Sequence, residues 1–409
     1  MSKSDENKRR VPKLRFPGFT EDWEQRKLGE IGSVSMCRRI FKEQTSESGE
    51  IPFYKIGTFG AKPDAYISKE LFEEYKAKYP YPKQGDILIS ASGSIGRTVE
   101  FTGKNEYFQD SNIVWLNHDE RLSNSFLKCF YSVVKWAGIE GSTIKRLYND
   151  NILNTPISLP TIPEQEQIGA FFANLDNLIT LHQRKCDRLK ELKKGLLQKM
   201  FPKNGEKIPE LRFSGFTEDW EQRKLSEVAL SFEYGLNAAA KEFDGVNKYL
   251  RITDIDDSSR IFKDDDLTSP DTDLSAASSY QLHDGEILFA RTGASVGKSF
   301  IYRESDDCVY FAGFLIRAKI KAEYDPEFIF QNTLGVPYEK YIQITSQRSG
   351  QPGVNAQEYG EYAFLVPDYA EQKKIGGFLR QIDNLITLHQ RKLDHLKELK
   401  KGLLQQMFV

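Results

Sequence analysis

The chain has 409 residues and a mass of 47.0 kDa, more than one compact domain usually holds, so we expect two domains. Hydrophobic residues make up 39% and charged residues 28%, a balance that excludes a disordered or collagen-like chain. The 57 basic and 59 acidic residues give a formal charge of −2, so any nucleic-acid surface must be local.

The four cysteines indicate a reducing compartment. Cys37, Cys129, Cys186 and Cys308 lie far apart and form no C-x-x-C pair, so neither a disulfide framework nor a cysteine zinc cluster is indicated. The first ten residues lack the apolar stretch of a signal peptide, and no window approaches the roughly 18 apolar residues of a membrane span. We therefore expect a cytoplasmic protein.

The beginning and the end of the chain's first half are written again in its second half. Residues 14–28, LRFPGFTEDWEQRKL, return at 211–225 with 14 of 15 positions identical, and residues 175–201 return at 382–408 with 23 of 27 identical. Between these frames the two centres have diverged. An internal repeat predicts two similar domains. A constant frame around diverged centres favours one shared architecture with two different recognition tasks.

The first centre and the second both alternate β-branched and aromatic runs with turn residues, which predicts mixed α/β globules. Helices are expected at residues 68–78 and 124–136. Strands are expected at residues 86–90, 112–116, 286–290 and 310–316.

Three charged residues of the first centre have the side chains of a metal-dependent nuclease. Asp64, Glu74 and Lys76 could hold a divalent cation beside a scissile phosphate. The segment that carries Glu74 and Lys76 also reads as a charged helix, and the second centre has no counterpart. A stand-alone nuclease is therefore an alternative function, and a solvated helix surface is the simpler interpretation.

Two kinds of loop in each centre are candidates for contact with DNA. Residues 92–97 and 291–298 follow a predicted strand, contain glycines that allow close backbone approach to a polyanion, and end on a cation. Residues 141–150 and 347–355 are rich in arginine, lysine, glutamine and asparagine, the side chains that read base edges. The same side chains also occur on ordinary surface loops.

The repeated end blocks predict two long helices, each beginning after a proline and a Glu-Gln pair. Apolar residues follow a heptad seam that Lys193 and Lys400 interrupt, so we expect an antiparallel helix pair. Two helices that each pack only on their own domain are the alternative. His182 and His389 occupy equivalent seam positions, where packing or a cross-helix hydrogen bond is favoured over chemistry. The predicted seam comprises Leu175, Ile179, His182, Leu189, Leu196, Ile382, Ile386, His389, Leu393, Leu396 and Leu403.

Taken together, the front block, the GDIL or GEIL strand with its SG or TG loop, the Glu-Gln junction and the basic heptad helix, twice over, resemble the specificity subunit of type I restriction-modification enzymes. The strings YLRITDI at 249–255, EILFARTGASVGK at 286–298 and SGQP at 349–352 resemble motifs of its target-recognition domains. The first half departs further from those motifs.

The resemblance implies an α/β (α+β) chain with an internal pseudo-twofold repeat. Two target-recognition domains, residues 11–160 and 206–366, would be separated by an antiparallel coiled coil formed by residues 161–205 and 367–409. Each domain would read one half of a bipartite, asymmetric DNA site, and helix length would set the unread spacer.

The resemblance also implies that this chain is not itself an enzyme. Two modification subunits would supply the S-adenosylmethionine-dependent methylation, and restriction subunits would supply the ATP- and Mg²⁺-dependent steps. A coiled-coil scaffold that does not bind DNA is a further alternative. The predicted DNA contacts are Ser92, Gly93, Ser94, Arg97, Lys145, Arg146, Arg251, Arg291, Thr292, Lys298, Arg348 and Gln351.

Overall fold

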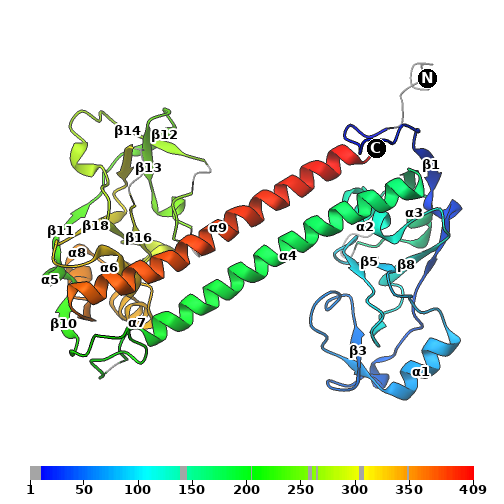
Figure 1. Ribbon diagram of the computed structural model, residues 1–409, viewed down its shortest axis with the longest axis horizontal. Helices are drawn as coiled ribbons and strands as arrows, with labels where there is room; N and C mark the ends of the chain where they lie inside the picture. Colours follow the sequence, from blue (N-terminus) through cyan, green and yellow to red (C-terminus); the bar gives the residue numbers. More distant parts are fainter. Residues whose placement is uncertain are drawn as a thin grey trace. The chain divides into compact units, whose positions relative to one another are not determined.

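The computed structural model describes residues 11–138, 145–203, 205–256, 260–263, 266–303, 308–347 and 350–409 (Figure 1). The chain forms two compact units. Residues up to Leu181, together with the segment from Leu393 to the end, make the first unit, and residues from His182 to Lys392 make the second. Each unit therefore contains one recognition centre and one half of each long helix.

The first unit is built on a four-stranded antiparallel sheet of order β2-β8-β5-β6, with a three-stranded sheet β4-β3-β7 and a pair β1-β9. The strands are β1 (Glu24–Lys27), β2 (Gly32–Ser35), β3 (Ile51–Tyr54), β4 (Tyr66–Ile67), β5 (Ile87–Ser90), β6 (Thr98–Glu100), β7 (Tyr107–Phe108), β8 (Ile113–His118) and β9 (Pro156–Leu159). The helices are α1 (Lys69–Lys78), α2 (Asn124–Val133), α3 (Asn149–Leu153) and the start of α4 (Ile162–Lys199).

The second unit repeats the four-stranded sheet as β11-β18-β15-β16 and the frame pair as β10-β19. Its strands are β10 (Glu221–Lys224), β11 (Ala229–Tyr234), β12 (Ala239–Glu242), β13 (Asn247–Leu250), β14 (Thr268–Asp271), β15 (Ile287–Ala290), β16 (Ser299–Ile301), β17 (Cys308–Phe311), β18 (Leu315–Ile320) and β19 (Ala363–Val366). Its helices are α5 (Leu225–Val228), α6 (Pro326–Asn332), α7 (Val336–Thr345), α8 (Ala356–Gly360) and most of α9 (Tyr369–Met407).

Both faces of the central sheet are covered, which explains its uninterrupted apolar strands. Ile87 and Ile89 of β5 pack into the core that contains the helix pair, whereas Leu88 packs on the opposite side with the three-stranded sheet. In the second unit, Phe289 and Leu288 of β15 divide between two cores in the same way. Successive side chains of a strand point to opposite faces, so a strand buried on both faces carries no polar alternation.

The repeated frame closes each unit through strand pairing. The front-block strand β1 pairs antiparallel with β9, aligning Glu24 with Leu159, and β10 pairs with β19, aligning Glu221 with Val366. The main-chain nitrogen of Leu14 also donates to the oxygen of Gln406 at 3.0 Å. The front block therefore joins the end of one long helix to the strand that precedes the other.

An aromatic trio forms the same junction in each unit. In the first unit Trp23 packs edge-on against Phe126 at 5.8 Å and Phe408 at 6.1 Å, measured between ring centroids. In the second unit Trp220 packs against Phe328 at 5.6 Å and against Phe201, two residues beyond the end of α4, at 6.1 Å. The tryptophan comes from the front block and the last phenylalanine from the helix end, so the repeated blocks meet in the core.

A buried arginine–glutamate pair fixes the start of each long helix. Arg15 contacts the carboxylate of Glu164 through two hydrogen bonds of 2.7 and 2.8 Å, and Arg212 binds Glu371 at 2.8 Å twice. Neither glutamate side chain is exposed to solvent. The acids of the Glu-Gln junctions therefore do more than favour the helix N-terminus, because each bonds to its front block.

Two of the shorter predicted elements differ from those observed. The strand expected at residues 310–316 is two strands, β17 and β18, because the main chain turns between them and the nitrogen of Leu315 donates to the oxygen of Ala312 at 2.9 Å. The helix expected at 124–136 ends at Val133, because Val134 has extended backbone angles. The other predicted strands and short helices are present with shifts of one or two residues at their ends. The long helices begin earlier than expected, at Ile162 and Tyr369, so the Glu-Gln pairs lie inside their first turns.

Candidate nucleic-acid interface

In the second unit the loop after β15 is tied to the loop before α8. The nitrogen of Gly293 donates to the oxygen of Pro352 at 3.0 Å, and the nitrogen of Val354 donates to the oxygen of Arg291 at 2.9 Å. Thr292 and Gly353 form an isolated β-bridge between these bonds. Gly293 has a φ of 74°, a left-handed conformation that a β-branched residue would adopt only with strain. The two loops predicted separately from the sequence therefore form one surface.

The first unit joins its own two loops by the same three contacts. The nitrogen of Gly93 donates to the oxygen of Lys145 at 3.3 Å, and the nitrogen of Leu147 donates to the oxygen of Ala91 at 2.8 Å. Ser92 bridges Arg146. The matching backbone bonds show that this paired-loop surface is a feature of the repeated fold, although most of the side chains on it differ.

The paired loops of the first unit present exposed cations and hydroxyls. Arg97, Lys145 and Arg146 are all exposed, as are Gly93 and Ser94. Ser92 is buried instead, and its hydroxyl is 2.7 Å from the side-chain oxygen of Asn112. Its predicted role in DNA contact stays a prediction, and its observed bond holds the loop against β8.

The paired loops of the second unit combine an arginine with aromatic side chains. The guanidinium of Arg291 lies over the ring of Tyr234, 5.1 Å from its centroid. The nitrogen of Arg291 donates to the oxygen of Phe314 at 3.1 Å, and the Phe314 side chain is 62% exposed. Gln351 is exposed in the neighbouring loop. A cation–π contact of this kind fixes the direction of the guanidinium.

Sequence reasoning missed Tyr234 and Phe314, because neither lies in a loop that the repeat comparison singled out. An aromatic residue at the end of a strand more often belongs to a core. The exposure of Phe314 comes from the turn between β17 and β18, which the sequence analysis assigned to a continuous strand.

Two other predicted contacts of the second unit are engaged within the protein. Arg251 forms two hydrogen bonds of 2.9 Å with the carboxylate of Asp254, which raises the pKa of the guanidinium. Lys298 is 8% exposed, and its ammonium lies 3.4 Å from the oxygen of Ile255. Contact with DNA stays a prediction for both. Arg348 lies outside the described residues.

The predicted seam residues line the interior of the helix pair in both units. Leu175, Ile179, Leu396 and Leu403 belong to the core of the first unit, and Leu189, Leu196, Ile382 and Ile386 to the core of the second. Leu393 is 1% exposed. Nδ1 of His182 lies 2.9 Å from Nδ1 of His389, so the predicted cross-helix hydrogen bond is present. His182 contacts His389, whereas Lys193, which lies later in α4, contacts Asp383, which lies earlier in α9. The two helices are therefore antiparallel within the second unit.

The lysines that interrupt the seam are paired with aspartates on the opposite helix. Lys193 contacts Asp383 at 2.6 Å in the second unit, and Lys400 contacts Asp176 in the first. Burial lowers the pKa of Lys193 despite the attraction of Asp383. A partly buried ion pair between helices costs desolvation and specifies register.

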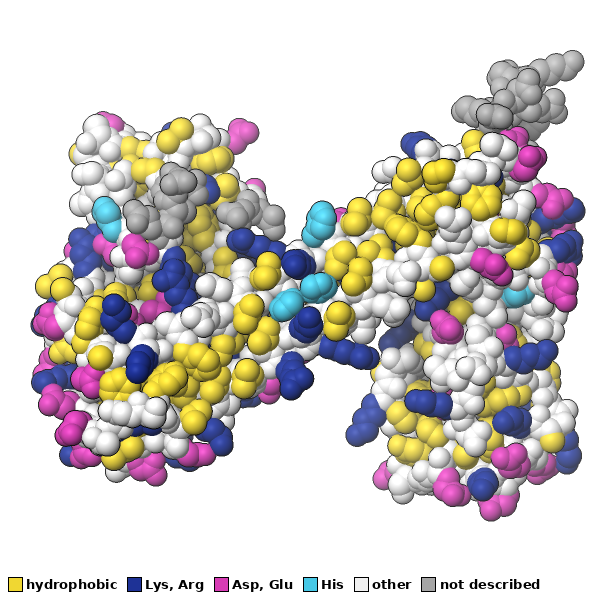
Figure 2. All heavy atoms as spheres, viewed as in Figure 1, with side chains coloured by type: hydrophobic (Ala, Val, Ile, Leu, Met, Phe, Trp, Pro, Cys, Tyr) yellow, Lys and Arg dark blue, Asp and Glu magenta, His cyan; other side chains and the backbone are white. Residues whose placement is uncertain are grey.

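A second apolar stripe runs along the outside of each long helix. Figure 2 shows hydrophobic side chains exposed among lysines and arginines along these helices. The spacing of these residues along the helix places the stripe on the face next to the seam. Its eight side chains are between 36% and 50% exposed and fall at equivalent positions of the repeat: Phe171, Leu178, Leu181 and Leu192 on α4, and Phe378, Leu385, Leu388 and Leu399 on α9.

The three residues considered for a nuclease are not brought together as metal ligands. Asp64 pairs with Lys55 at 2.9 Å, Glu74 pairs with Lys78 at 2.9 Å, and the ammonium of Lys76 lies over the rings of Phe72 and Tyr81. No group of three or more metal-ligating side chains occurs among the residues that the structure describes.

Across the described part of the chain, no helix has the length and apolarity needed to cross a membrane. Charged residues occur along the whole length of the long helices α4 and α9, so neither has a continuous apolar sequence.

Comparison with known proteins gives matches along nearly the whole chain. A family model described as the type I restriction modification DNA specificity domain matches residues 20–191 and again residues 217–398. The second match places a copy of the same domain in each half of the chain, in agreement with the internal repeat.

Individual relatives and a solved structure carry the same description. A putative type I restriction enzyme specificity subunit from Haemophilus influenzae is 62% identical over 157 residues, which cover 37% of this chain and 41% of that protein. A type I restriction enzyme specificity subunit from Methanocaldococcus jannaschii is 25% identical over 423 residues, covering 99% and 96%. The crystal structure of a type I restriction-modification system S subunit from M. genitalium has the same fold, with a TM-score of 0.64, 17% identity, and coverage of 98% and 99%.

Proposed function

This chain belongs to the type I restriction modification DNA specificity domain family, and from that membership we propose that each of its two domains reads one half of a split, asymmetric DNA target. The observation that supports this most directly is the paired-loop surface. Both units build it with the same backbone bonds, yet one carries Lys145 and Arg146 where the other carries Pro352 and Gly353. Different side chains on equivalent backbones favour two different half-sites.

The chemistry of the exposed side chains suits direct contact with a duplex. Arginine forms paired hydrogen bonds with guanine, and glutamine does so with adenine. Arg146 of the first unit and Arg291 and Gln351 of the second are therefore our candidates for base contacts. Arg97 and Lys145 are our candidates for phosphate contacts, because cations beside a glycine loop can follow the backbone without reading bases.

We also propose that two copies of one modification subunit bind the outer apolar stripes, one copy on the stripe of α4 and one on the stripe of α9. Solvent-exposed leucines at heptad spacing favour burial against another helix. The first unit presents Leu178 and Leu181, and the second presents Leu385 and Leu388 at equivalent positions. Because the two stripes match residue for residue, they support two identical partner segments.

In this proposal the chain recognises DNA and its partners perform catalysis in the cytoplasm. The modification subunits would bind S-adenosylmethionine and methylate adenine, and restriction subunits would use ATP and Mg²⁺. The helix pair would set the unread spacer between the half-sites.

Methylation mapping tests the proposal. The chain is expressed with a cognate modification subunit, and the methylated motif is compared before and after residues 206–366 are exchanged for the centre of another specificity subunit. We expect a split adenine-methylated motif in which one half changes and the other half is retained. Change of both halves, or of neither, would contradict the assignment of one half-site to each domain.

Two controls separate the alternatives. DNA cleavage by the purified chain with Mg²⁺ alone, lost on Asp64→Ala, would support a stand-alone nuclease. A motif that does not depend on either centre would support a scaffold without a DNA role.

A further inference from the structure

The second unit contains a large cavity, one wall of which is the loop that also carries the predicted DNA contact Lys298. Its volume is about 1180 Å³, and the end of α4, the helix α7, the middle of α9 and the loop at residues 294–298 surround it. All of these segments belong to the second unit. Small-molecule sites usually measure roughly 300–1,000 Å³, so this cavity is larger than one ordinary metabolite requires.

The cavity has a strong excess of positive charge. Eight lysine or arginine side chains line it, against only two carboxylates, those of Asp383 and Glu339. Asp383 is already neutralised by Lys193 and also accepts a hydrogen bond from Gln331. Lys203 and Arg303 are likewise paired, with Glu210 and Glu327, so the charge offered to an occupant comes from a smaller set of side chains.

Three of the cations have no anionic partner within the described structure. Lys190 and Lys194 lie one turn apart on α4, and Lys340 lies on α7 across the cavity. None of the three forms an ion pair with any described residue, in contrast to Arg303, which is bound to Glu327 at 2.8 Å. Helices on two sides thus present uncompensated ammonium groups to the same space.

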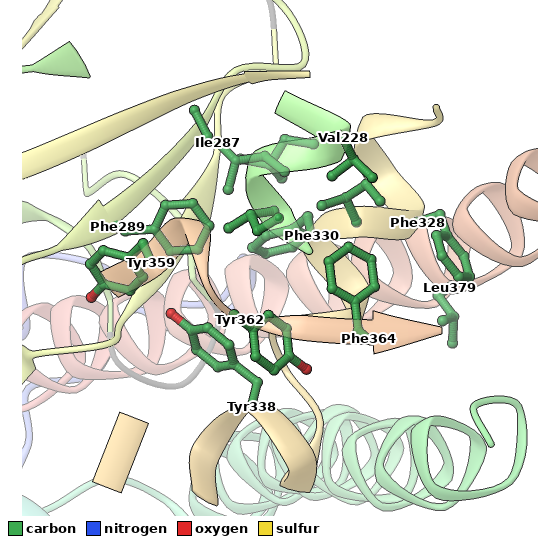
Figure 3. Close-up of a cluster of buried hydrophobic side chains, with 14 of the residues drawn as sticks. Val228, Ile287, Phe289, Phe328, Phe330, Tyr338, Tyr359, Tyr362, Phe364 and Leu379 are labelled. Atoms are coloured by element: carbon green, nitrogen blue, oxygen red, sulfur yellow. The ribbon is translucent and has the colours of Figure 1, made fainter. Parts of the chain in front are cut away.

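The floor of the cavity is apolar. Phe330 and Tyr338, which Figure 3 shows within the buried cluster of this unit, also line the cavity, and they are 2% and 3% exposed. Leu197 of α4, Leu334 and Ile342 continue the apolar lining. Phe330 and Tyr338 are already buried, so an occupant gains by covering the partly exposed Leu197 and Leu334, at about 25 cal/mol for each Å² of apolar surface removed from water.

A cavity of the first unit, beside the start of α4 and the end of α9, is smaller and electrically balanced. It measures about 460 Å³. The two lysines that line it, Lys128 and Lys400, are paired with the two carboxylates, Glu100 and Asp176. In the second unit, α7 belongs to the centre and α4 and α9 belong to the repeated frame, so both contribute to the large basic cavity.

We propose that this cavity of the second unit is the docking site for an acidic amphipathic helix of a partner protein, bound once per chain. Charge complementarity requires an anionic occupant, and the apolar floor requires one with an apolar face. A helix about 10 Å across that rises 1.5 Å per residue occupies roughly 120 Å³ per residue, so the cavity accommodates about ten residues.

A DNA backbone satisfies only half of this description. Phosphates would neutralise the lysines, but their hydration would be lost over the apolar floor without compensation. A helix with leucines on one side and glutamates along its flanks meets both demands, in the way that amphipathic helices occupy grooves elsewhere. The site also lies on the opposite side of the α4 seam from the apolar stripe, so it is distinct from the surface proposed for the modification subunits.

Fluorescence anisotropy with the full-length chain tests the proposal. The probe is a fluorescein-labelled peptide of about 14 residues with leucine at positions a, d and e of two heptads and glutamate at the others. We expect saturable binding that weakens roughly tenfold or more in the double variant Lys190→Glu/Lys194→Glu, because reversed charges repel the glutamates. Lys340→Glu, on the opposite wall, is expected to weaken binding as well.

The repeat provides a matched control. Lys397 and Lys401 occupy the equivalent positions on α9, in the first unit. Lys397→Glu/Lys401→Glu is expected to leave peptide affinity within about twofold of the parent chain. Equal loss in both double variants would overturn the proposal, since it would indicate attraction to the helices in general.

Changes to the probe keep the test independent of protein folding. A peptide with lysine in place of glutamate, and one with glutamine in place of leucine, should each fail to bind the parent chain. Binding of either would contradict the two-part recognition. A duplex of about 20 base pairs is titrated in parallel. If Lys190→Glu/Lys194→Glu weakens duplex binding while the glutamate peptide does not bind, the cavity is a phosphate surface and the proposal is wrong.

Discussion

The imidazoles of His182 and His389 meet across the helix pair with their Nδ1 atoms 2.9 Å apart. The two residues are equivalents in the repeat, so this contact joins a position to its own copy. One Nδ1 must donate and the other must accept, which requires at least one neutral ring. Burial lowers the pKa of His389, and the nearby charges of His182, Lys185 and Lys392 lower it further.

This histidine pair predicts a loss of stability in mild acid. Because the pKa of His389 is lower in the folded chain than the usual value near 6.5, the unfolded chain takes up the proton first as pH falls. The contribution of His389 to stability is therefore fully present above about pH 6.5 and decreases as the pH falls below that value. Thermal unfolding at pH 7.5 and 5.5 should show this decrease, and His182→Leu/His389→Leu should reduce it. His395→Gln, at an exposed position, is the control and should leave the decrease unchanged.

Removal of Arg15 should strongly destabilise the chain. Arg15→Met leaves the fully buried carboxylate of Glu164 without its partner, and breaking a buried pair in this way costs about 3–5 kcal/mol. Urea unfolding measures the loss. The double variant Arg15→Met/Glu164→Leu should recover much of it, because no buried charge then remains. A double variant as unstable as the single one would show that packing by the arginine stem matters more than charge.

The two seam lysines should differ in their contribution to stability. Lys193 and Asp383 are 12% and 20% exposed, whereas Lys400 and Asp176 are 24% and 36% exposed. Lys193→Met should therefore cost about 1–3 kcal/mol and Lys400→Met less, because water solvates the abandoned aspartate better in the second case. Chemical unfolding of the two variants compares these costs, and a larger loss for Lys400→Met would contradict the expectation.

Substitutions on the paired loops should alter one half-site at a time. Gln351→Ala should reduce discrimination in the half read by the second unit by about 1–3 kcal/mol, or roughly 5- to 150-fold. Arg146→Ala should act in the same way on the other half. Binding of the assembled complex to duplexes with single-base changes measures both. Equal weakening on all sequences would assign the residue to phosphate contact instead.

Substitution of the apolar stripe should remove partners one by one. Leu181→Glu and Leu388→Glu occupy equivalent positions, so each should release one modification subunit and leave the other bound. The double variant should bind neither. Native mass spectrometry of the reconstituted complex gives the stoichiometry directly, and each single variant serves as the control for the other.

Local features of the structure were largely predictable from the sequence, and the long-range contacts were not. The heptad spacing predicted α4 and α9, and the glycine loops predicted where Gly93 and Gly293 would permit close approach. No local pattern linked Arg15 to Glu164, which is 149 residues away. The arginine fills no periodic position, and its partner was interpreted only as a favourable residue for a helix start.

The cavity was unpredictable for a similar reason. The basic run at residues 184–203, which includes Lys190 and Lys194, is compatible in sequence with a solvated face, with phosphate contact or with an acidic partner. The wall opposite these lysines is α7, a helix that the sequence analysis did not identify. Helix periodicity in α7 is weak because the helix begins with Val336 and Pro337, and it is only ten residues long. A short helix with one buried edge leaves little imprint on composition.

In each aromatic trio, two rings come from the repeated frame and one comes from the centre. In the first unit the frame supplies Trp23 and Phe408, and the centre supplies Phe126. In the second unit the frame supplies Trp220 and Phe201, and the centre supplies Phe328.

The frame also forms a hydrogen bond with the main chain close to Phe126 in the first unit and close to Phe328 in the second. The amide oxygen of Gln165 accepts from the nitrogen of Ser123 at 2.8 Å, and that of Gln372 accepts from Asp325 at 3.0 Å. Neither hydrogen bond involves the loops that differ between the two centres. We therefore expect that a centre with a phenylalanine at this position fits either pair of frame aromatic residues, so that an exchange of centres leaves the receiving core unchanged.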